Sequence, residues 1–179
     1  FDKEKKRMLL GLDNGHLLSL SPVDQTANAK IDLPGRIVSI SKNSSGDYLL
    51  SSDGGLRILN NNLQMNPCFK LNETAKTAFE DKSKNLWIGG SQTAALFNPL
   101  TTSSCYQLDT AVLPNRTYGI SQDASGKIWL GSGKGIFFYD GKLTKPLLEN
   151  GVQRPYRVSA AASNTFGDIF FSTLGDGIV

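Results

Sequence analysis

Apolar residues recur along this chain in short runs, each bounded by Gly, Asp, Asn or Ser. One type of run, which ends on Gly or Ser, occurs five times: Met8-Leu9-Leu10-Gly11, Tyr48-Leu49-Leu50-Ser51, Leu86-Trp87-Ile88-Gly89, Ile128-Trp129-Leu130-Gly131 and Ile169-Phe170-Phe171-Ser172. We call each run an anchor. The second residues of the anchors are 9, 49, 87, 129 and 170, so the intervals are 40, 38, 42 and 41 residues. Such a period is typical of propeller blades, in which every repeat is a four-stranded sheet.

The fourth repeat shows most clearly how one unit is built, because turn residues separate four short apolar runs. The predicted strands are Thr117–Ser121, Lys127–Gly131, Gly135–Tyr139 and Leu143–Leu148. Between the first and second strands the spacing is nine residues in four repeats: Ile40 to Leu49, Ala78 to Trp87, Ile120 to Trp129 and Ala161 to Phe170. Equal spacing predicts equal strand pairing in each blade.

Apolar and polar residues do not alternate strictly within these strands, which indicates sheets that are buried on both faces. Trp87 and Trp129 are therefore expected to pack between blades. Windows with helical periodicity are nearly absent, so the predicted class is all-β. Propellers close with about four to eight blades, and this chain accounts for about four and a half, which predicts a partial ring of four-stranded antiparallel blades.

The expected blades are 1–34 (partial), 35–72, 73–114, 115–154 and 155–179 (partial). Arg7–Leu10 corresponds to a second strand, and Gly177–Val179 stands where a third strand begins. We therefore expect both ends of the chain to fall inside a repeat and the natural start of the polypeptide to lie upstream.

Composition narrows the class of protein further. The chain is 39% apolar and 20% charged, as in ordinary globular proteins, and it has no apolar run of the roughly 18 residues that cross a membrane. Its net charge is +3, with scattered basic residues, so nucleic acid is not an expected partner.

Few residues are candidates for catalysis or metal binding. Cys68 and Cys105 are expected to be two separate thiols on outer strands, and with the lone His16 they form no metal-ligand set. Asp81 and Asp123, and likewise Asp13, Asp53 and Asp176, recur in hairpins and are interpreted as Asx turns. No catalytic residue, metal or cofactor is expected.

Arginine recurs at one position of the repeat. Arg36, Arg116 and Arg157 each lie thirteen residues before the second residue of the following anchor, whereas the third repeat has Thr74 there. This position precedes each innermost strand, at the mouth of a propeller channel. Guanidinium groups bind carboxylates and sulfates, and tyrosine rings stack on sugars. The predicted ligand-binding residues are Arg36, Arg116, Tyr118, Tyr156 and Arg157, and ordinary salt bridges are the competing interpretation.

The fourth repeat closely resembles the two-component regulator propeller repeat, in Leu113–Tyr118, Ile120, Asp123, Gly126, Ile128–Gly131 and Gly135–Phe137. The third repeat matches it in Asp81, Asn85–Gly90 and Leu96–Pro99. Such repeats are typical of the periplasmic sensor region of Bacteroidetes hybrid two-component systems, which detects oligosaccharides. The resemblance implies a larger inner-membrane protein with further blades, a linking β-domain, a membrane helix, a histidine kinase and a receiver.

The expected partners are thus an oligosaccharide, in particular an anionic one, the remaining propeller blades of the parent chain, and a second copy in a homodimer. Two alternatives stay open at this point. One is a propeller enzyme of the streptogramin-lyase type, which would need a histidine and acidic cluster at the channel mouth. The other is a protein interaction scaffold, since propeller rims are general docking surfaces.

Overall fold

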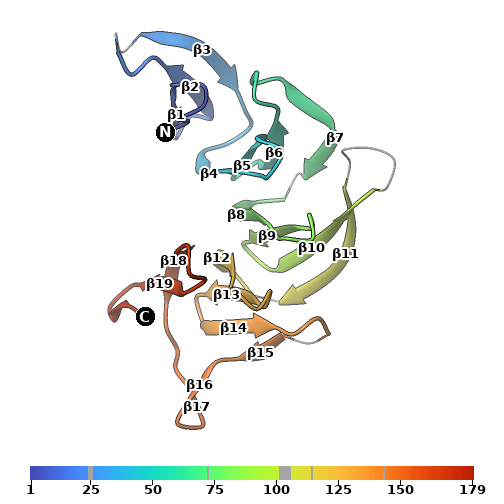
Figure 1. Ribbon diagram of the computed structural model, residues 1–179, viewed down its shortest axis with the longest axis vertical. Coiled ribbons are helices and arrows are strands. Elements are labelled where there is room, and N and C mark those ends of the chain that lie inside the picture. The colour runs from blue at the N-terminus through green and yellow to red at the C-terminus, as the bar shows by residue number, and fades with distance from the viewer. Residues whose placement is uncertain (24–25, 72, 101–105, 114, 143) are drawn as a thin grey trace.

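The computed structural model describes residues 1–23, 26–71, 73–100, 106–113, 115–142 and 144–179, and all of the regular structure in these ranges is β-strand. Five of the six antiparallel sheets in these ranges follow one another along an arc, like petals around a common centre (Figure 1). The fold is therefore the predicted all-β partial propeller.

Each sheet is built from strands that are consecutive in the chain, joined by hairpins. Blade 1 holds β1 (Met8–Gly11), β2 (His16–Leu20) and β3 (Ala27–Asp32). Blade 2 holds β4 (Ile37–Lys42), β5 (Tyr48–Ser52), β6 (Gly55–Leu59) and β7 (Met65–Leu71). Blade 3 holds β8 (Ala75–Glu80), β9 (Leu86–Gly90), β10 (Ala94–Pro99) and β11 (Tyr106–Leu113). Blade 4 holds β12 (Thr117–Gln122), β13 (Ile128–Ser132), β14 (Gly135–Tyr139) and β15 (Thr144–Pro146), and blade 5 holds β18 (Val158–Ser163), β19 (Ile169–Thr173) and β20 (Gly177–Ile178).

The first strands of blades 2 to 5, which are β4, β8, β12 and β18, lie on the concave side of the arc, and β3, β7 and β11 lie on its outside (Figure 1). They pair with their second strands in one common register: Ile40 with Leu50, Ala78 with Ile88, Ile120 with Leu130, and Ala161 with Phe171. A register shift also recurs at one place, between Ile37 and Ser39, Ala75 and Thr77, Thr117 and Gly119, and Val158 and Ala160. The equal geometry predicted from the spacing is thus confirmed, and each first strand begins with a β-bulge.

Tryptophan packs between blades, as predicted. Trp87 of blade 3 is 2% exposed and belongs to an apolar cluster with Ile120 and Leu130 of blade 4. Its ring also meets the edge of Tyr139, with centroids 5.3 Å apart. Trp129 of blade 4 packs in the same way against a cluster that contains Val158 and Phe171 of blade 5.

Glycine at the end of an anchor allows neighbouring blades to approach closely. A Cβ atom on Gly131 would lie 2.4 Å from Val158 Cγ1 of the next blade, a distance that real Cβ atoms do not adopt. Gly11 meets Ile37 in the same manner, also at 2.4 Å. A larger residue at either place would push two sheets apart.

Asx turns close the hairpins between first and second strands. The Oδ1 atom of Asp81 accepts hydrogen bonds from the backbone N–H groups of Ser83 and Asn85, at 2.8 and 2.9 Å. Its Oδ2 atom accepts one from Nε1 of the buried Trp87, at 2.8 Å. Asp123 binds Trp129 Nε1 at the same distance of 2.8 Å. The Asx-turn prediction is confirmed for both aspartates, and the structure adds that each one also holds the tryptophan of its own anchor.

The hairpin before β1 follows the same plan, which the sequence analysis missed. Asp2 is 7% exposed, and its Oδ1 atom accepts hydrogen bonds from the N–H groups of Glu4 and Lys5. Its Oδ2 atom accepts one from the hydroxyl of Tyr48 in blade 2. This last bond is the main reason why the pKa of Asp2 falls from 3.8 to about 2, against the opposing effect of burial, and Lys42 lowers it further.

Blade 4 departs from the expected pattern at its outer edge. The strand predicted over 143–148 is shortened to β15, Thr144–Pro146, and Leu143 lies outside the described residues. A separate hairpin follows, formed by β16 (Leu148–Glu149) and β17 (Val152–Gln153). Its two turn residues, Asn150 and Gly151, both have positive φ, at 52° and 79°, as type I′ turns require.

Two further observations concern His16 and the two cysteines. His16 on β2 is 30% exposed, with Nδ1 2.5 Å from Asp32 Oδ1, whereas the equivalent residues Leu56 and Ile136 are buried. This position is therefore less buried in blade 1 than in blades 2 and 4. Cys105 and the side chain of Cys68 lie outside the described residues, so the expectation of two separate thiols stays a prediction.

Replacing Asp81 with alanine is expected to destabilise the protein by about 1–3 kcal/mol, because the buried indole N–H of Trp87 would lose its acceptor. Urea denaturation measures this as a lower midpoint. Asp13→Ala, at an exposed turn position, is the control and should stay within about 0.5 kcal/mol of the parent protein. Equal effects of the two substitutions would contradict this account of the turn.

Asp2→Asn is expected to reduce the free energy of unfolding at pH 7. In acid, the free energies of unfolding of the variant and the parent protein should become more similar. The folded pKa of Asp2 is depressed, so its contribution is present above pH 3.8 and is lost as the pH falls toward about 2. Denaturation midpoints measured across this range provide the test. The exposed Glu73→Gln variant is the control, and a pH-independent gap for Asp2→Asn would refute the linkage.

Candidate functional site

The arginine positions lie at one rim of the concave side, immediately before the first strands. We call Arg36, Thr74, Arg116 and Arg157 the slot residues. In three blades the carbonyl of the slot residue accepts a hydrogen bond from the backbone N–H four places after the second residue of the anchor: Asp53 to Arg36 at 3.0 Å, Gly133 to Arg116 at 3.3 Å, and Leu174 to Arg157 at 2.8 Å. The main chain therefore places the three arginines equivalently.

Arg36 is held by a carboxylate. Its Nε atom lies 3.3 Å from Asp53 Oδ2, and Lys76 Nζ of blade 3 lies 2.9 Å from Asp53 Oδ1. The hydrogen bond from Lys76 is the largest cause that lowers the pKa of Asp53. Asp53 thus joins two blades at the rim, and its interpretation as an Asx turn was wrong, because its carboxylate binds two cations.

Lys76 was missed by the sequence analysis. It is the extra residue of the β-bulge in β8, so its side chain is re-aimed relative to a regular strand. The signal in the sequence is that the third repeat lacks an arginine at the slot but has a lysine two residues later. Lys76 therefore supplies the cationic side chain of blade 3 at this rim, and Asp53 pairs with it and with Arg36 of blade 2.

Arg116 and Arg157 have a different environment. Both are exposed, and no carboxylate oxygen lies within 4.0 Å of either guanidinium group in the part of the chain that the structure describes. Arg116 Nη1 donates a hydrogen bond to the Tyr118 hydroxyl, at 3.3 Å. Tyr118 is the bulge residue of β12, half-buried, and thus occupies in blade 4 the place of Lys76.

Tyr156 is occupied by other contacts. Its hydroxyl donates to Glu149 Oε1 at 2.6 Å, which is the main reason why its pKa is raised. Its ring packs against the cluster of Ile136, Val158 and Phe171. The structure therefore brings Arg116 and Tyr118 together and ties Tyr156 to the β16–β17 hairpin, while its role in ligand binding stays a prediction.

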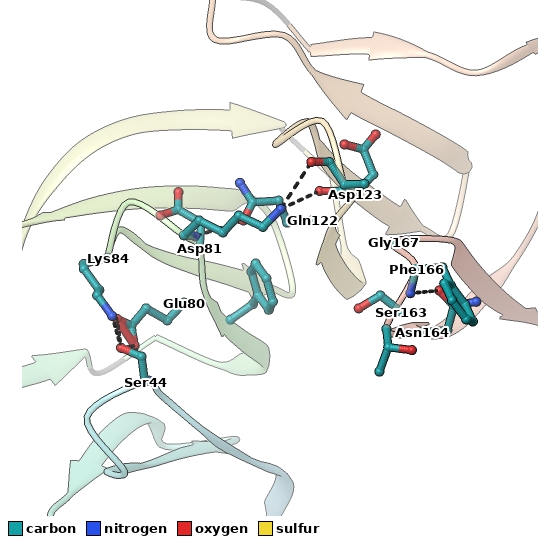
Figure 2. A pocket seen from close by; sticks show the side chains of 14 residues that line it. Ser44, Glu80, Asp81, Lys84, Gln122, Asp123, Ser163, Asn164, Phe166 and Gly167 are labelled. Atoms are coloured by element: carbon teal, nitrogen blue, oxygen red, sulfur yellow. Dashed lines mark hydrogen bonds and ion pairs between the residues drawn. The ribbon is translucent and has the colours of Figure 1, made fainter.

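A cleft lies at the opposite ends of the first strands, where the hairpin turns of blades 2 to 5 approach each other. Its volume is about 600 Å³, and Figure 2 shows side chains from four blades around it. Two of its charged groups have polar partners: Glu80 accepts hydrogen bonds from the backbone N–H and hydroxyl of Ser44, and Lys82 Nζ donates to the backbone carbonyls of Asp123 and Ala124. This cleft therefore lacks the open positive charge of the arginine rim.

Two features that other functions would require are absent from the described ranges. No group of three or more His, Cys, Asp and Glu side chains is placed to hold a metal ion there. Nor does any helix of sufficient length and apolarity to span a membrane occur among those residues.

Comparison with known proteins identifies the fold. No protein-family model and no curated protein matches the sequence. Among solved structures, the extracellular domain of the hybrid two-component system BT3049 from B. thetaiotaomicron matches with a TM-score of 0.75 and 19% identity, over 99% of this chain and 26% of that one. The equivalent domain of BT4673 from the same organism has a TM-score of 0.74 and 18% identity, over 97% of this chain and 25% of that one.

A structure described as a gluconolactonase matches with a TM-score of 0.69 and 14% identity, over 99% of this chain and 70% of that one. At these identities the likeness establishes the β-propeller fold, and the presence of hybrid two-component systems among the matches agrees with the resemblance seen in the repeats. The chain spans about a quarter of the length of the two B. thetaiotaomicron domains.

Removing Lys76 is expected to raise the pKa of Asp53 toward its ordinary value, since the hydrogen bond from Lys76 is the largest cause of the depression. NMR titration of the Asp53 carboxyl carbon in Lys76→Ala would measure this. Arg36→Ala should raise the pKa less, because the effects of Arg36 rank below those of Lys76. A larger rise in Arg36→Ala than in Lys76→Ala would show that Arg36, and not Lys76, is the main cause of the lowered pKa of Asp53.

Proposed function

We propose that this chain belongs to the periplasmic sensor region of a hybrid two-component system, anchored in the inner membrane, and that it binds an anionic oligosaccharide at its arginine rim. The observation that carries the proposal is the pair Arg116 and Arg157. They stand at equivalent positions of neighbouring blades, exposed and without a carboxylate within 4.0 Å in the described ranges. The solved extracellular domains of two such systems support the class of protein.

The chemistry of the rim suits a charged sugar. Each guanidinium group offers parallel N–H donors that match a carboxylate or sulfate, and Arg is less strongly hydrated than Lys, so it loses less on binding. Tyr118 lies beside Arg116 and offers an amphipathic ring for the sugar face. A ligand with both an anionic group and a pyranose ring would contact Arg116, Arg157 and Tyr118 together.

Sensing requires that the ligand favour one of two arrangements of the protein. A bound oligosaccharide shifts such an equilibrium only by its difference in affinity for the two states. Because β12 and β18 belong to separate blades, a ligand that contacts Arg116 and Arg157 would bind across a blade interface. In this proposal, that bias passes to a histidine kinase through the homodimer.

A binding role fits the rim better than an enzymatic one. The only histidine of the chain, His16, lies on β2 of blade 1 beside Asp32, whereas the slot arginines precede the first strands of blades 2, 4 and 5. Guanidinium groups remain protonated in proteins and cannot act as general bases. The rim therefore supplies charge recognition, and we assign the region no catalytic step.

The test is binding and signalling by the full-length sensor. Arg116→Ala and Arg157→Ala are each expected to weaken the binding of an anionic oligosaccharide about tenfold, as is usual for loss of a charge-assisted hydrogen bond. Calorimetric titration measures the affinity, and kinase autophosphorylation should shift to higher ligand concentration by the same factor.

Arg154→Ala is the matched control, because Arg154 is also exposed but is paired with Glu149, its Nε atom 3.3 Å from Oε2. It should leave the affinity unchanged. The site is wrong if both slot variants bind as tightly as this control, and the sensor role is wrong if ligand binds without any change in autophosphorylation.

A further inference from the structure

The slot arginines are equivalent in backbone geometry but differ in one neighbouring residue. That residue stands four places after the second residue of each anchor and donates its N–H to the slot carbonyl. It is Asp53 in blade 2, Gly133 in blade 4 and Leu174 in blade 5. We call it the gate residue.

An aspartate at the gate position forms an ion pair with the slot arginine. In blade 2 the carboxylate of Asp53 takes both Arg36 and, across the interface, Lys76 of blade 3. An incoming anion would have to displace a carboxylate that already has two cationic partners. In blades 4 and 5 the gate residues carry no charge, so Arg116 and Arg157 keep their positive charge open.

We infer that the anionic group of the ligand binds to Arg116 of blade 4 and Arg157 of blade 5. We call this part of the rim the sector of blades 4 and 5. At the equivalent place in blades 2 and 3, the Asp53 carboxylate excludes the anion because it already pairs with Arg36 and Lys76. The inference rests on the proposed function. It adds where on the rim the anion binds, and that Asp53 is the residue that excludes it elsewhere. The shared chemistry of the bound group is that of a sulfate or a carboxylate on a sugar.

Two acidic residues lie beside Tyr156, which directly precedes Arg157. Glu149 pairs with Arg154 and accepts the hydrogen bond of Tyr156, and Asp176 lines a cleft with these three residues. Neither carboxylate lies within 4.0 Å of Arg116 or Arg157 in the described part of the chain. The open charge of the sector is therefore not cancelled locally.

The aspartate of the blade 2 gate can be introduced at the equivalent position of blade 4, which is Gly133. A Cβ atom built on Gly133 meets no other heavy atom within 4 Å, and its φ lies outside the left-handed region, so a side chain fits without strain. Its N–H already bonds the carbonyl of Arg116 as that of Asp53 bonds Arg36. Gly133→Asp would thus place a carboxylate beside Arg116, and Gly133→Asn would place a neutral group of the same shape there.

The experiment titrates the full-length sensor with a short dextran sulfate, and with unsulfated dextran of equal length as the neutral probe. Gly133→Asp is expected to weaken dextran sulfate binding about tenfold relative to Gly133→Asn, because Arg116 would be paired internally. Affinity should also depend less on salt in Gly133→Asp, since one charge contact is lost. A carboxylated oligosaccharide such as oligogalacturonate, used in parallel, distinguishes the two sources of negative charge.

The reverse change tests Asp53 itself. In the Arg116→Ala/Arg157→Ala background, Asp53→Asn is expected to restore dextran sulfate binding, because it frees Arg36 and Lys76. Equal affinities of Gly133→Asp and Gly133→Asn, or no restoration by Asp53→Asn, would overturn the inference while leaving the arginine rim as the site. If the arginine variants themselves bind like the parent protein, the proposed function fails as well.

Discussion

The structure depends on the packing of each sheet against the next one. Such packing tolerates little variation, because the two surfaces must fit at the density of a protein interior. The consequence is visible in the first strands, where Ile40, Ala78, Ile120 and Ala161 pair with partners ten residues later and every strand starts with a bulge. The slot residues, which precede these bulges, inherit the same geometry, so the recurrence of Arg36, Arg116 and Arg157 in the sequence becomes a recurrence in space.

Within this constraint, residue size is balanced across each interface. Gly11, Gly89 and Gly131 end their anchors, and they meet the branched side chains of Ile37, Thr117 and Val158 in the following blade. Blade 2 ends its anchor with the larger Ser51, and the equivalent residue of blade 3 is the smaller Ala75; both are fully buried. Volume is thus conserved while the individual residues change, as expected for a well-packed core.

Much of the fold could be predicted from the sequence because packing imposes a period that residues reveal directly. The anchors, the constant spacing and the interblade position of Trp87 all follow from that period. Other features depend on local chemistry that the period hides. The Asn150-Gly151 turn ends the regular pattern of blade 4 and forms an additional hairpin. Asp2 closes a turn in a repeat with an altered spacing, and the indole bonds of Asp81 and Asp123 depend on side-chain directions that a linear pattern does not specify.

The site was less predictable for a physical reason. The arginine position could be found by counting residues, but the charge of the rim depends on pairs that join different strands and blades. Asp53 appears in the sequence as a turn residue, and only the fold places it between Arg36 and Lys76. Gate residues lie outside the packed interfaces, so glycine, leucine and aspartate are all compatible with the same scaffold. Such positions can therefore vary while the packing between blades is kept, so equivalent blades of one chain can carry different charges at the same place.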